Sequence, residues 1–435
     1  MAIKMKKHNQ IFFLISFFLF PFFSFSQLPF NCYFGNLHSH TSYSDGVGNP
    51  RHAFVYARDT AHIDFLAVTE HLEILDSSEW DSVKFMADEV SVDSVFIGIA
   101  GYEWTSDTFG HCNVFDTPVM LSPLNVNGEH NWNSFVQDVI NENHIVTQFN
   151  HPGFPLNSLN WNSFTYMGES VDSAFALIEI IYYLEEYFYK MALDSNWHVS
   201  PSDNQDNHDA DWGTKNEGRT GVWATQLTRQ ALFDAIKAGR TFSTMDKNSS
   251  VWLDINGTPM GSEIPYTANM PLHIVLNDAD TEQWSDIQLI GANGRLFLSL
   301  TNHAAFLDTI VYITPSVSKW LYLKAKQYDD QYVFSAPIYI NGLPQGINNY
   351  WKQFDIAVSP NPLNTLSTVT FQLNETRNVT LKISDISGRW ITTLCDHKLP
   401  EGKHKFNIPS ANLTQGVYLL EYNDGKVCKT IKIIR

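Results

Sequence analysis

The nine residues HSHTSYSDG at positions 38–46 follow directly on an apolar stretch at 33–37. In a strand, residues i and i+2 point to the same face and lie about 6–7 Å apart, so the side chains of His38 and His40 can converge on one ion. Asp45 adds a carboxylate on the tight turn that follows. A lone H-x-H pair is weak evidence, and the rest of the chain has to supply further ligands.

Further metal-binding side chains recur where other apolar, strand-like runs end. The runs are FLAVTEH at 65–71, VFIGIAGYEW at 95–104 and IVTQFNHPG at 145–153, and shorter motifs follow in GHCNVF at 110–115 and DNH at 206–208. For any one of these groups alone, a polar residue at the mouth of a barrel without a metal-binding role is a sufficient explanation. Six groups at strand ends favour a shared site, because these ends form the active-site face of α/β barrels.

The pattern of apolar residues divides the chain after the N-terminus. Up to about residue 244, strand-like runs alternate with helical patterns at 50–62, 79–90, 131–143 and 226–239, which predicts a parallel α/β sheet or barrel. From 250 onward short alternating strands predict an antiparallel β-sandwich of about 100 residues. We expect a hydrolase domain at 27–249, an accessory β-sandwich at 250–347, a linker at 348–354 and a further β-rich module at 355–435.

Imidazole and carboxylate together are the ligands of zinc, manganese and iron. Nine residues are candidate metal ligands: His38, His40, Asp45, His71, Glu103, His111, His151, Asp206 and His208. They are enough for two or three divalent ions, which lower the pKa of bound water towards ~7 and so supply hydroxide as a nucleophile. Metal-dependent hydrolysis follows, with Glu103, Asp206 and His208 as the expected catalytic residues.

These motifs, in this order and spacing, resemble the PHP (polymerase and histidinol phosphatase) superfamily. The DNH motif, followed by Trp212-Gly213, Arg219-Thr220-Gly221 and GRTFST at 239–244, is similar to the carbaryl-hydrolase-like (CehA/McbA) subgroup. The resemblance implies a distorted seven-stranded β/α barrel. It also implies three ligand sets: His38, His40, Glu103 and Asp206 for one ion; Asp45, His71 and His208 for a second; His111, His151 and Glu103 for a third.

Two positions depart from the family pattern, and two arginines are candidates for binding substrate. Asp45 stands where many members have His, which bears on metal number or preference. Glu70 stands where many have Asp, and there a carboxylate is expected to orient a ligand histidine. Arg219 and Arg240 are candidates for a two-pronged contact with an anionic substrate group. A structural ion pair is the alternative for both.

The two ends of the chain carry targeting features. Lysines precede an apolar run at 11–25, and Ser24 and Ser26 fit a cleavage site, so residues 1–26 are expected to be a secretory signal peptide. A membrane anchor is the less favoured alternative, because the run is short and interrupted by Pro21. No later run spans 18 apolar residues, so no transmembrane span is expected after cleavage.

The last module resembles the C-terminal sorting domain of type IX secretion, through SPNP at 359–362, LKISDISGRWI at 381–391 and GVYLLEY at 416–422. The resemblance implies a C-terminal β-sandwich, contact with the type IX secretion machinery, and a secreted or outer-membrane surface location reached through the periplasm. Cys395 and Cys428 are a candidate disulfide, with free thiols as the equal alternative.

The sequence as a whole predicts a secreted hydrolase that acts on a small-molecule ester, most of all a phosphoester. A carboxyl ester or carbamate hydrolase with the same metal site is the alternative, and a non-catalytic surface protein that binds glycan or metal is the alternative of another class. The chain has 28 Lys and Arg against 46 Asp and Glu, a net charge of −18. Nucleic-acid binding is therefore not expected, because it depends on an excess of positive side chains that neutralise the phosphates.

Overall fold

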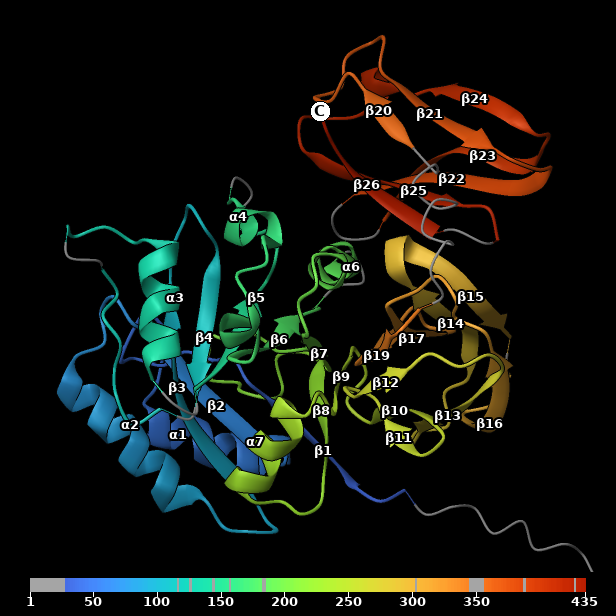
Figure 1. The fold of residues 1–435 in the computed structure, drawn as a ribbon. Helices are drawn as coiled ribbons and strands as arrows, with labels where there is room; N and C mark the ends of the chain where they lie inside the picture. The colour runs from blue at the N-terminus through green and yellow to red at the C-terminus, as the bar shows by residue number, and fades with distance from the viewer. Residues whose placement is uncertain are drawn as a thin grey trace, which may run out of the picture.

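The computed structural model describes residues 28–435 except 116, 125–126, 143–144, 156–157, 182–184, 302, 344–355, 386–388 and 426–427, and except the side chains at 412 and 428. The expected signal peptide at 1–26 and linker at 348–354 lie outside the described residues. Figure 1 shows three bodies in chain order: a mixed α/β body in blue and green, a middle β-rich body in yellow and orange, and a C-terminal β-rich body in red.

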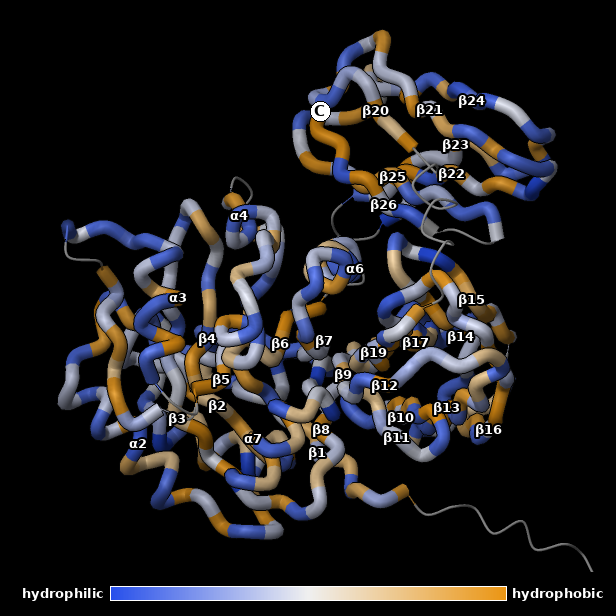
Figure 2. The backbone as a smooth tube through the Cα atoms, in the orientation of Figure 1, coloured by the Kyte–Doolittle hydropathy of each residue, from blue (hydrophilic) through white to orange (hydrophobic). Residues whose placement is uncertain are grey.

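A mixed sheet of nine strands forms the first body, in the order β9-β8-β1-β2-β3-β4-β5-β6-β7. Its strands are β1 (Asn31–Asn36), β2 (Phe65–His71), β3 (Ile97–Trp104), β4 (His111–Phe115), β5 (Val146–Asn150), β6 (Phe175–Glu179), β7 (Ser200–Ser202), β8 (Arg219–Ala224) and β9 (Thr241–Thr244). The predicted strand at 65–71 is confirmed as β2, and six of its seven residues are buried. Figure 2 shows hydrophobic colour around β2, β5 and β6.

Helices connect the strands of the first body: α1 (Pro50–Tyr56), the π-helix η1 (Ala57–Ala61), α2 (Ser77–Val90), α3 (Trp132–Asn141), α4 (Asn160–Phe164), α5 (Glu169–Asp172), α6 (Glu186–Asp194) and α7 (Arg229–Lys237). The four predicted helical segments are confirmed by α1 with η1, α2, α3 and α7. Local chemistry explains their ends. Asp76 and Glu79 form a capping box at the start of α2. Gly239, with φ of +65°, follows the end of α7.

Two reversed strands correct the expected parallel sheet. β1, β2 and β3 are parallel, as are β5, β6 and β7, but β4 pairs antiparallel with both β3 and β5, and β8 pairs antiparallel with both β1 and β9. For β4, the reason is the length of the connection. Only six residues separate Trp104 from His111, whereas a parallel crossover needs a dozen or more. Because β4 runs backwards, its first residue lies beside the carboxyl ends of its neighbours.

The two ends of the nine-stranded sheet approach each other through side chains. Thr241 Oγ1 on β9 donates to the Pro201 carbonyl on β7 at 2.9 Å, and Thr220 Oγ1 on β8 donates to the Asp203 carbonyl at 3.0 Å. Among the described residues no backbone pairing joins β7 to β8 or β9. The structure thus shows a mixed sheet with an α/β connection pattern, and the closed seven-stranded barrel stays a prediction.

The strands of the middle body pair antiparallel as predicted, except that β12 pairs parallel with β19. They are β10 (Ser249–Ile255), β11 (Thr258–Pro259), β12 (Glu263–Pro265), β13 (Met270–Asp278), β14 (Trp284–Gly291), β15 (Arg295–Leu300), β16 (Phe306–Ile313), β17 (Trp320–Gln327), β18 (Tyr332–Ser335) and β19 (Ile338–Asn341), with the short helix η3 (Ala292–Gly294). One sheet has the order β11-β10-β13-β16. The other continues the sheet of the first body, because β18 pairs with β9. The two bodies are therefore joined by backbone hydrogen bonds.

The C-terminal body consists of two sheets, β20-β21-β24 and β23-β22-β25-β26. Its elements are β20 (Ala357–Ser359), β21 (Thr368–Leu373), β22 (Arg377–Asp385), β23 (Trp390–Leu399), β24 (Gly402–Asn407), η4 (Ser410–Asn412), β25 (Val417–Asn423) and β26 (Cys428–Ile434). A core of its own, which includes Val369, Leu381 and Tyr422, holds these sheets together.

The strand order of the C-terminal body corrects the candidate disulfide. Cys395 lies on β23 and Cys428 on β26, with β22 and β25 between them. Three strand spacings of about 4.8 Å separate them by about 14 Å, whereas a disulfide needs Cα atoms within about 7 Å. Cys395 is a free thiol.

No helix among the described residues is both long enough and apolar enough to cross a membrane.

Candidate metal centre

All nine predicted ligands lie at one edge of the sheet in the first body. The edge is formed by the carboxyl ends of the parallel strands, together with the first residue of the reversed strand β4, His111. The segment that leaves β1 runs alongside the DNH motif, since Ser39 forms a β-bridge with Asn207 and the His40 N–H donates to the Asn207 carbonyl at 2.8 Å. Motifs more than 160 residues apart in the sequence are thereby brought together.

Glu103 is the central carboxylate of the buried half of the centre. It is 1% exposed, and its two oxygens lie 3.3 Å from His38 Nε2 and 3.5 Å from His40 Nε2. Its Oε1 also lies 3.3 Å from His111 Nδ1 and 3.4 Å from His151 Nε2. Its Oε2 lies 3.1 Å from His71 Nδ1 as well. One carboxylate therefore faces five imidazoles, which suits a bridging ligand.

Asp206 contributes a second carboxylate to the same half of the centre. Its Oδ1 lies 3.3 Å from the Nε2 atoms of both His38 and His40. The backbone of Asp206 has φ of +43°, a left-handed conformation in which a short polar side chain is tolerated.

The exposed half of the centre contains Asp45, His71 and His208. Asp45 Oδ1 lies 3.1 Å from His208 Nε2 and 3.5 Å from His71 Nε2, and the Asp45 side chain is 52% exposed. His40 connects the two halves, because its ring lies between those of His71 and His208, at centroid distances of 4.4 and 4.2 Å. Solvent reaches the centre through this half.

The side chains fit divalent metal ions. Four overlapping groups each place their ligand atoms within 4.8 Å of one another: His40 with Asp45, His71 and His208; His38 with His40 and Glu103; His38 with His151 and Asp206; and Glu103 with His111 and His151. The Nε2 atoms of His38 and His40 face each other at 3.3 Å. Two ring nitrogens with a carboxylate oxygen beside both form a nitrogen and oxygen donor set of the kind that binds zinc, manganese and iron.

Burial and charge set the protonation of the buried half. Burial lowers the pKa of His40 to about 4, against the opposing effect of Asp206 and Glu103, so its ring is neutral and able to bind a metal at neutral pH. Burial alone would raise the pKa of Glu103. The charge of His38 and the hydrogen bonds from His111 and His151 outweigh burial and hold that pKa well below its usual range, which keeps Glu103 ionised.

Glu179 is a buried carboxylate of the centre that the motifs did not single out. It is the last residue of β6 and is fully buried. Its Oε1 lies 2.9 Å from His38 Nδ1, and its Oε2 accepts a hydrogen bond from the His151 N–H at 2.6 Å. A carboxylate on Nδ1 fixes the ring so that Nε2 points to the metal. Its signal in the sequence is a single carboxylate within the apolar run ALIEII at 176–181.

Glu70 holds the turn that carries Asp45. It accepts hydrogen bonds from the Thr41 N–H at 3.1 Å and from the hydroxyls of Thr41 and Ser44. Its contribution is therefore to the shape of the HSHTSYSDG segment, whereas the carboxylate that contacts a ligand histidine directly is Glu179.

The two arginines predicted to bind substrate have other partners. Arg219 is 5% exposed and donates to the carbonyls of Gly213, Asn216 and Gly218 at 2.6–3.1 Å. Arg240 donates to the Trp223 carbonyl and packs over the ring of Phe30 at 4.5 Å. Both guanidinium groups bind backbone carbonyls or cover an aromatic ring, and their role as substrate ligands stays a prediction.

A pocket of about 460 Å³ adjoins the centre. His151 and Asp206 contribute to its wall from the centre. The rest of the wall includes aromatic residues, polar residues and three residues of the C-terminal body: Pro152, Gly153, Phe154, Ile181, Glu185, Tyr187, Phe188, Gln205, Lys215, Asn216, Val417, Leu419 and Lys432. A small substrate with an apolar part and an anionic group fits such a wall.

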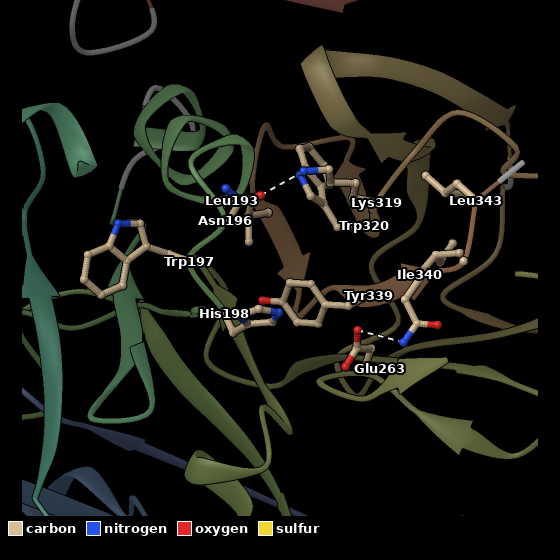
Figure 3. Close-up of a pocket in the computed structure, with 12 residues that line it drawn as sticks. Leu193, Asn196, Trp197, His198, Glu263, Lys319, Trp320, Tyr339, Ile340 and Leu343 are labelled. Atoms are coloured by element: carbon tan, nitrogen blue, oxygen red, sulfur yellow. Dashed lines mark hydrogen bonds between the residues drawn. The ribbon is translucent and has the colours of Figure 1, made fainter. Parts of the chain in front are cut away.

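A second pocket, of about 350 Å³, lies between the first and middle bodies and is lined by residues other than the nine candidate ligands (Figure 3). Its histidine, His198, is hydrogen-bonded through Nδ1 to Asp172 at 2.6 Å and packs against the ring of Tyr339. Two further hydrogen-bonded pairs line the pocket, Lys319 with Asn196 and Glu263 with Asn341. The polar groups of this pocket are largely paired with one another.

Comparison with known families matches residues 357–435 to the secretion system C-terminal sorting domain. This match confirms the expected sorting domain in the C-terminal body, and such a domain indicates secretion or attachment at the outer-membrane surface. No curated protein sequence matches the chain.

Three solved structures are similar to the chain at low sequence identity. A two-domain protein from Bacteroides vulgatus that contains a predicted PHP-like metal-dependent phosphoesterase has a TM-score of 0.40 and 16% identity, over 68% of this chain and 91% of that one. PsfC from Pseudomonas syringae has a TM-score of 0.36 and 13% identity, over 48% and 90%. A lesion-specific endonuclease from Pyrococcus furiosus has a TM-score of 0.35 and 14% identity, over 48% and 56%. With TM-scores below 0.5, these likenesses carry no weight for the function.

Proposed function

We propose that this protein is a secreted metal-dependent hydrolase of small esters, with phosphoesters as the leading substrate class. The observation that carries the proposal is the overlap of four ligand groups around Glu103 and His40, next to a pocket of about 460 Å³. When bound, divalent ions supply a hydroxide-like nucleophile near neutral pH and polarise the ester. Two or three ions of zinc, manganese or iron match the ligand sets.

The chain's own residues have distinct roles in this proposal. Glu103 holds the ligand imidazoles around one ionised carboxylate, and Glu179 fixes the orientation of His38. Asp206 lies at the boundary of the centre and the pocket, where a carboxylate is able to accept the proton of an attacking water. His208, 33% exposed and 3.1 Å from Asp45, faces the open side of the centre.

Lys215 favours an anionic substrate. It lies on the pocket wall, and its Nζ is 3.6 Å from Asp209, an exposed carboxylate that leaves the ammonium only weakly paired. Phe154, Tyr187 and Phe188 supply apolar area for the leaving group. A carboxyl ester or carbamate hydrolase is the second candidate, favoured by these aromatic walls. The closed seven-stranded PHP barrel and the carbaryl-hydrolase-like subgroup are part of the same proposal, as is export by type IX secretion through the sorting domain.

A panel of substrates separates these candidates. Protein purified without chelator is assayed on p-nitrophenyl phosphate, bis-p-nitrophenyl phosphate and p-nitrophenyl acetate, with manganese, zinc or iron(II) added singly. Turnover of a phosphoester, together with a higher KM for it in Lys215→Ala, supports the leading class. Faster turnover of the acetate, unaffected by Lys215→Ala, supports the second candidate. Bound metal without turnover of any ester supports a non-catalytic surface protein that binds glycan or metal and contradicts the hydrolase.

A further inference from the structure

One face of the C-terminal body lies against the pocket that adjoins the histidine centre. Val417 and Leu419 on β25 and Lys432 on β26 line this pocket, as does Phe188 on α6. Leu419 and Lys432 are register partners, so their side chains lie side by side on one face of the sheet. Figure 1 shows β25 and β26 on the side of the C-terminal body that faces α6. The sorting domain therefore supplies part of the pocket wall.

The same face is covered by another part of the chain. Along β25, the side chains of Tyr418, Leu420 and Tyr422 belong to the core of the C-terminal body. Side chains alternate along a strand, so Val417 and Leu419 point to the opposite face. Leu419 is nevertheless only 6% exposed. Because the domain's own core lies on the other side of the sheet, this burial indicates contact with the bodies that form the rest of the pocket.

The charged side chains that line the pocket differ in how they are paired. Of the two carboxylates, Glu185 accepts a backbone hydrogen bond, and Asp206 lies 3.3 Å from two imidazole nitrogens. Of the two ammonium groups, that of Lys215 is 3.6 Å from an exposed carboxylate. Lys432 forms no ion pair with any residue that the structure describes. The positive charges of the wall are therefore the ones available to a ligand.

We propose that Lys432 binds the anionic group of the substrate together with Lys215, which makes the sorting domain a substrate-binding element of the pocket. This rests on the proposed function, because the anionic group is that of the expected phosphoester. An ammonium is a compact charge with three donors, so two of them are able to contact different oxygens of one phosphate. Lys215 belongs to the first body and Lys432 to the C-terminal body. The pocket thus has its full positive charge only while these bodies are in contact.

Calorimetric titration of the full chain with phenylphosphonate tests this role. The probe has an aromatic ring and an anionic phosphonate, but a carbon–phosphorus bond replaces the ester, so it reports binding without turnover. Lys432→Ala should weaken binding about fivefold, the effect of a well-formed exposed ion pair. Lys432→Arg keeps the charge and should bind within about twofold of wild type. Lys405→Ala is the matched control, because β24 lies in the other sheet of the same body, and it should leave the Kd unchanged.

Three outcomes would overturn the role of Lys432. One is no binding heat with the wild-type chain at up to about 10 mM phenylphosphonate, tenfold above the usual upper range of KM. Another is an unchanged Kd in Lys432→Ala. The third is equal weakening by Lys432→Ala and Lys405→Ala, which would indicate a diffuse positive surface.

The titration also separates this role from the proposed hydrolysis. Phenylphosphonate binding that depends on Lys432, without turnover of any ester of the panel, would support the binding role and contradict the hydrolase. Turnover of p-nitrophenyl phosphate with a KM that Lys432→Ala leaves unchanged would support the hydrolase and contradict the binding role.

Discussion

The histidine centre and the junction cluster, three carboxylates where the first and middle bodies meet (Asp246, Asp278 and Glu282), bring acidic side chains together in different ways. At the histidine centre, one buried carboxylate, Glu103, faces five imidazoles. At the junction, Asp246 and Asp278 both accept hydrogen bonds from the buried amide of Gln327. The first group of donors is mixed nitrogen and oxygen, and the second is oxygen alone. The difference teaches that ligand chemistry, more than total negative charge, marks a transition-metal centre.

The two regions also differ in what holds them. The histidine centre is built at the edge of one sheet, and further buried groups such as Glu179 orient its ligands. The junction cluster takes Asp246 from one body and Asp278 from another. We therefore expect changes at the first region to affect chemistry, and changes at the second to affect the attachment of the middle body.

The largest expected effect comes from His40, which belongs to two of the four ligand groups. His40→Ala should lower kcat/KM of the metal-loaded enzyme by more than about 100-fold, beyond the 10–100-fold typical of changes around the ligands. His52→Ala is the matched control, because His52 lies on α1 and packs edge-on against Trp212. Steady-state kinetics on the best ester of the panel measure both. Equal losses in the two variants would contradict the assignment.

A smaller effect is expected from Glu179, a positioning residue that acts through His38. Glu179→Gln keeps the shape of the side chain but removes the charge on His38 Nδ1, and it should lower metal affinity and activity about 10–100-fold. The readout is the metal concentration that gives half-maximal activity, together with the melting temperature. Glu169→Gln, an exposed change on α5, is the control. A fall in melting temperature without a shift in metal affinity would show a merely structural role.

Glu186 on α6 shows how the chain neutralises a buried carboxylate where no metal is needed. Its oxygens lie 2.7 Å from Lys324 Nζ and 3.3 Å from Lys190 Nζ, and it accepts a hydrogen bond from Tyr322 at 2.6 Å. Burial raises its pKa, but these partners outweigh burial and lower it to about 2 from 4.5. The resulting stability is present above pH 4.5 and is lost as the pH falls towards 2.

Glu186→Gln should lower the free energy of unfolding by about 3 kcal/mol at pH 7, because it leaves two lysines without their buried partner. Urea unfolding at pH 7 and pH 3 measures the change, and the difference from wild type should shrink at pH 3. An equal difference at both pH values would refute the electrostatic account of this contact.

The smallest expected effect sharpens the comparison between the two regions. Asp278→Asn should leave kcat/KM within about twofold, because the junction cluster shares no residue with the histidine centre. Steady-state kinetics on the same ester measure this. A loss of activity as large as that of Glu179→Gln would show that the two regions are energetically linked.

Much of the local structure could be predicted from the sequence. The run FLAVTEH at 65–71 coincides with β2, and the helical pattern at 79–90 lies within α2, because periodicity and caps act over a few residues. The nine candidate ligands could be selected because each belongs to a short motif at a strand end. Their gathering at one edge followed from strand direction.

What the sequence could not predict depends on pairings between distant segments. The reversal of β4 and the pairing of β18 with β9 are set by tertiary packing. Gln327 has no local signal, since only strand pairing brings it to Asp246 and Asp278. The partners of Arg219 have no local signal either, because the carbonyls of Gly213 and Gly218 that accept from its guanidinium depend on the folded loop.

Metal content is the most direct test of the central claim, that the nine residues at the sheet edge hold transition-metal ions. Elemental analysis is performed on the full protein purified without chelator, alongside the double variant His38→Ala/His40→Ala and the Asp278→Asn variant. The account predicts two or three equivalents of zinc, manganese or iron per wild-type chain, fewer than one in the double variant, and an unchanged amount in Asp278→Asn. Unchanged transition-metal content in the double variant would contradict it.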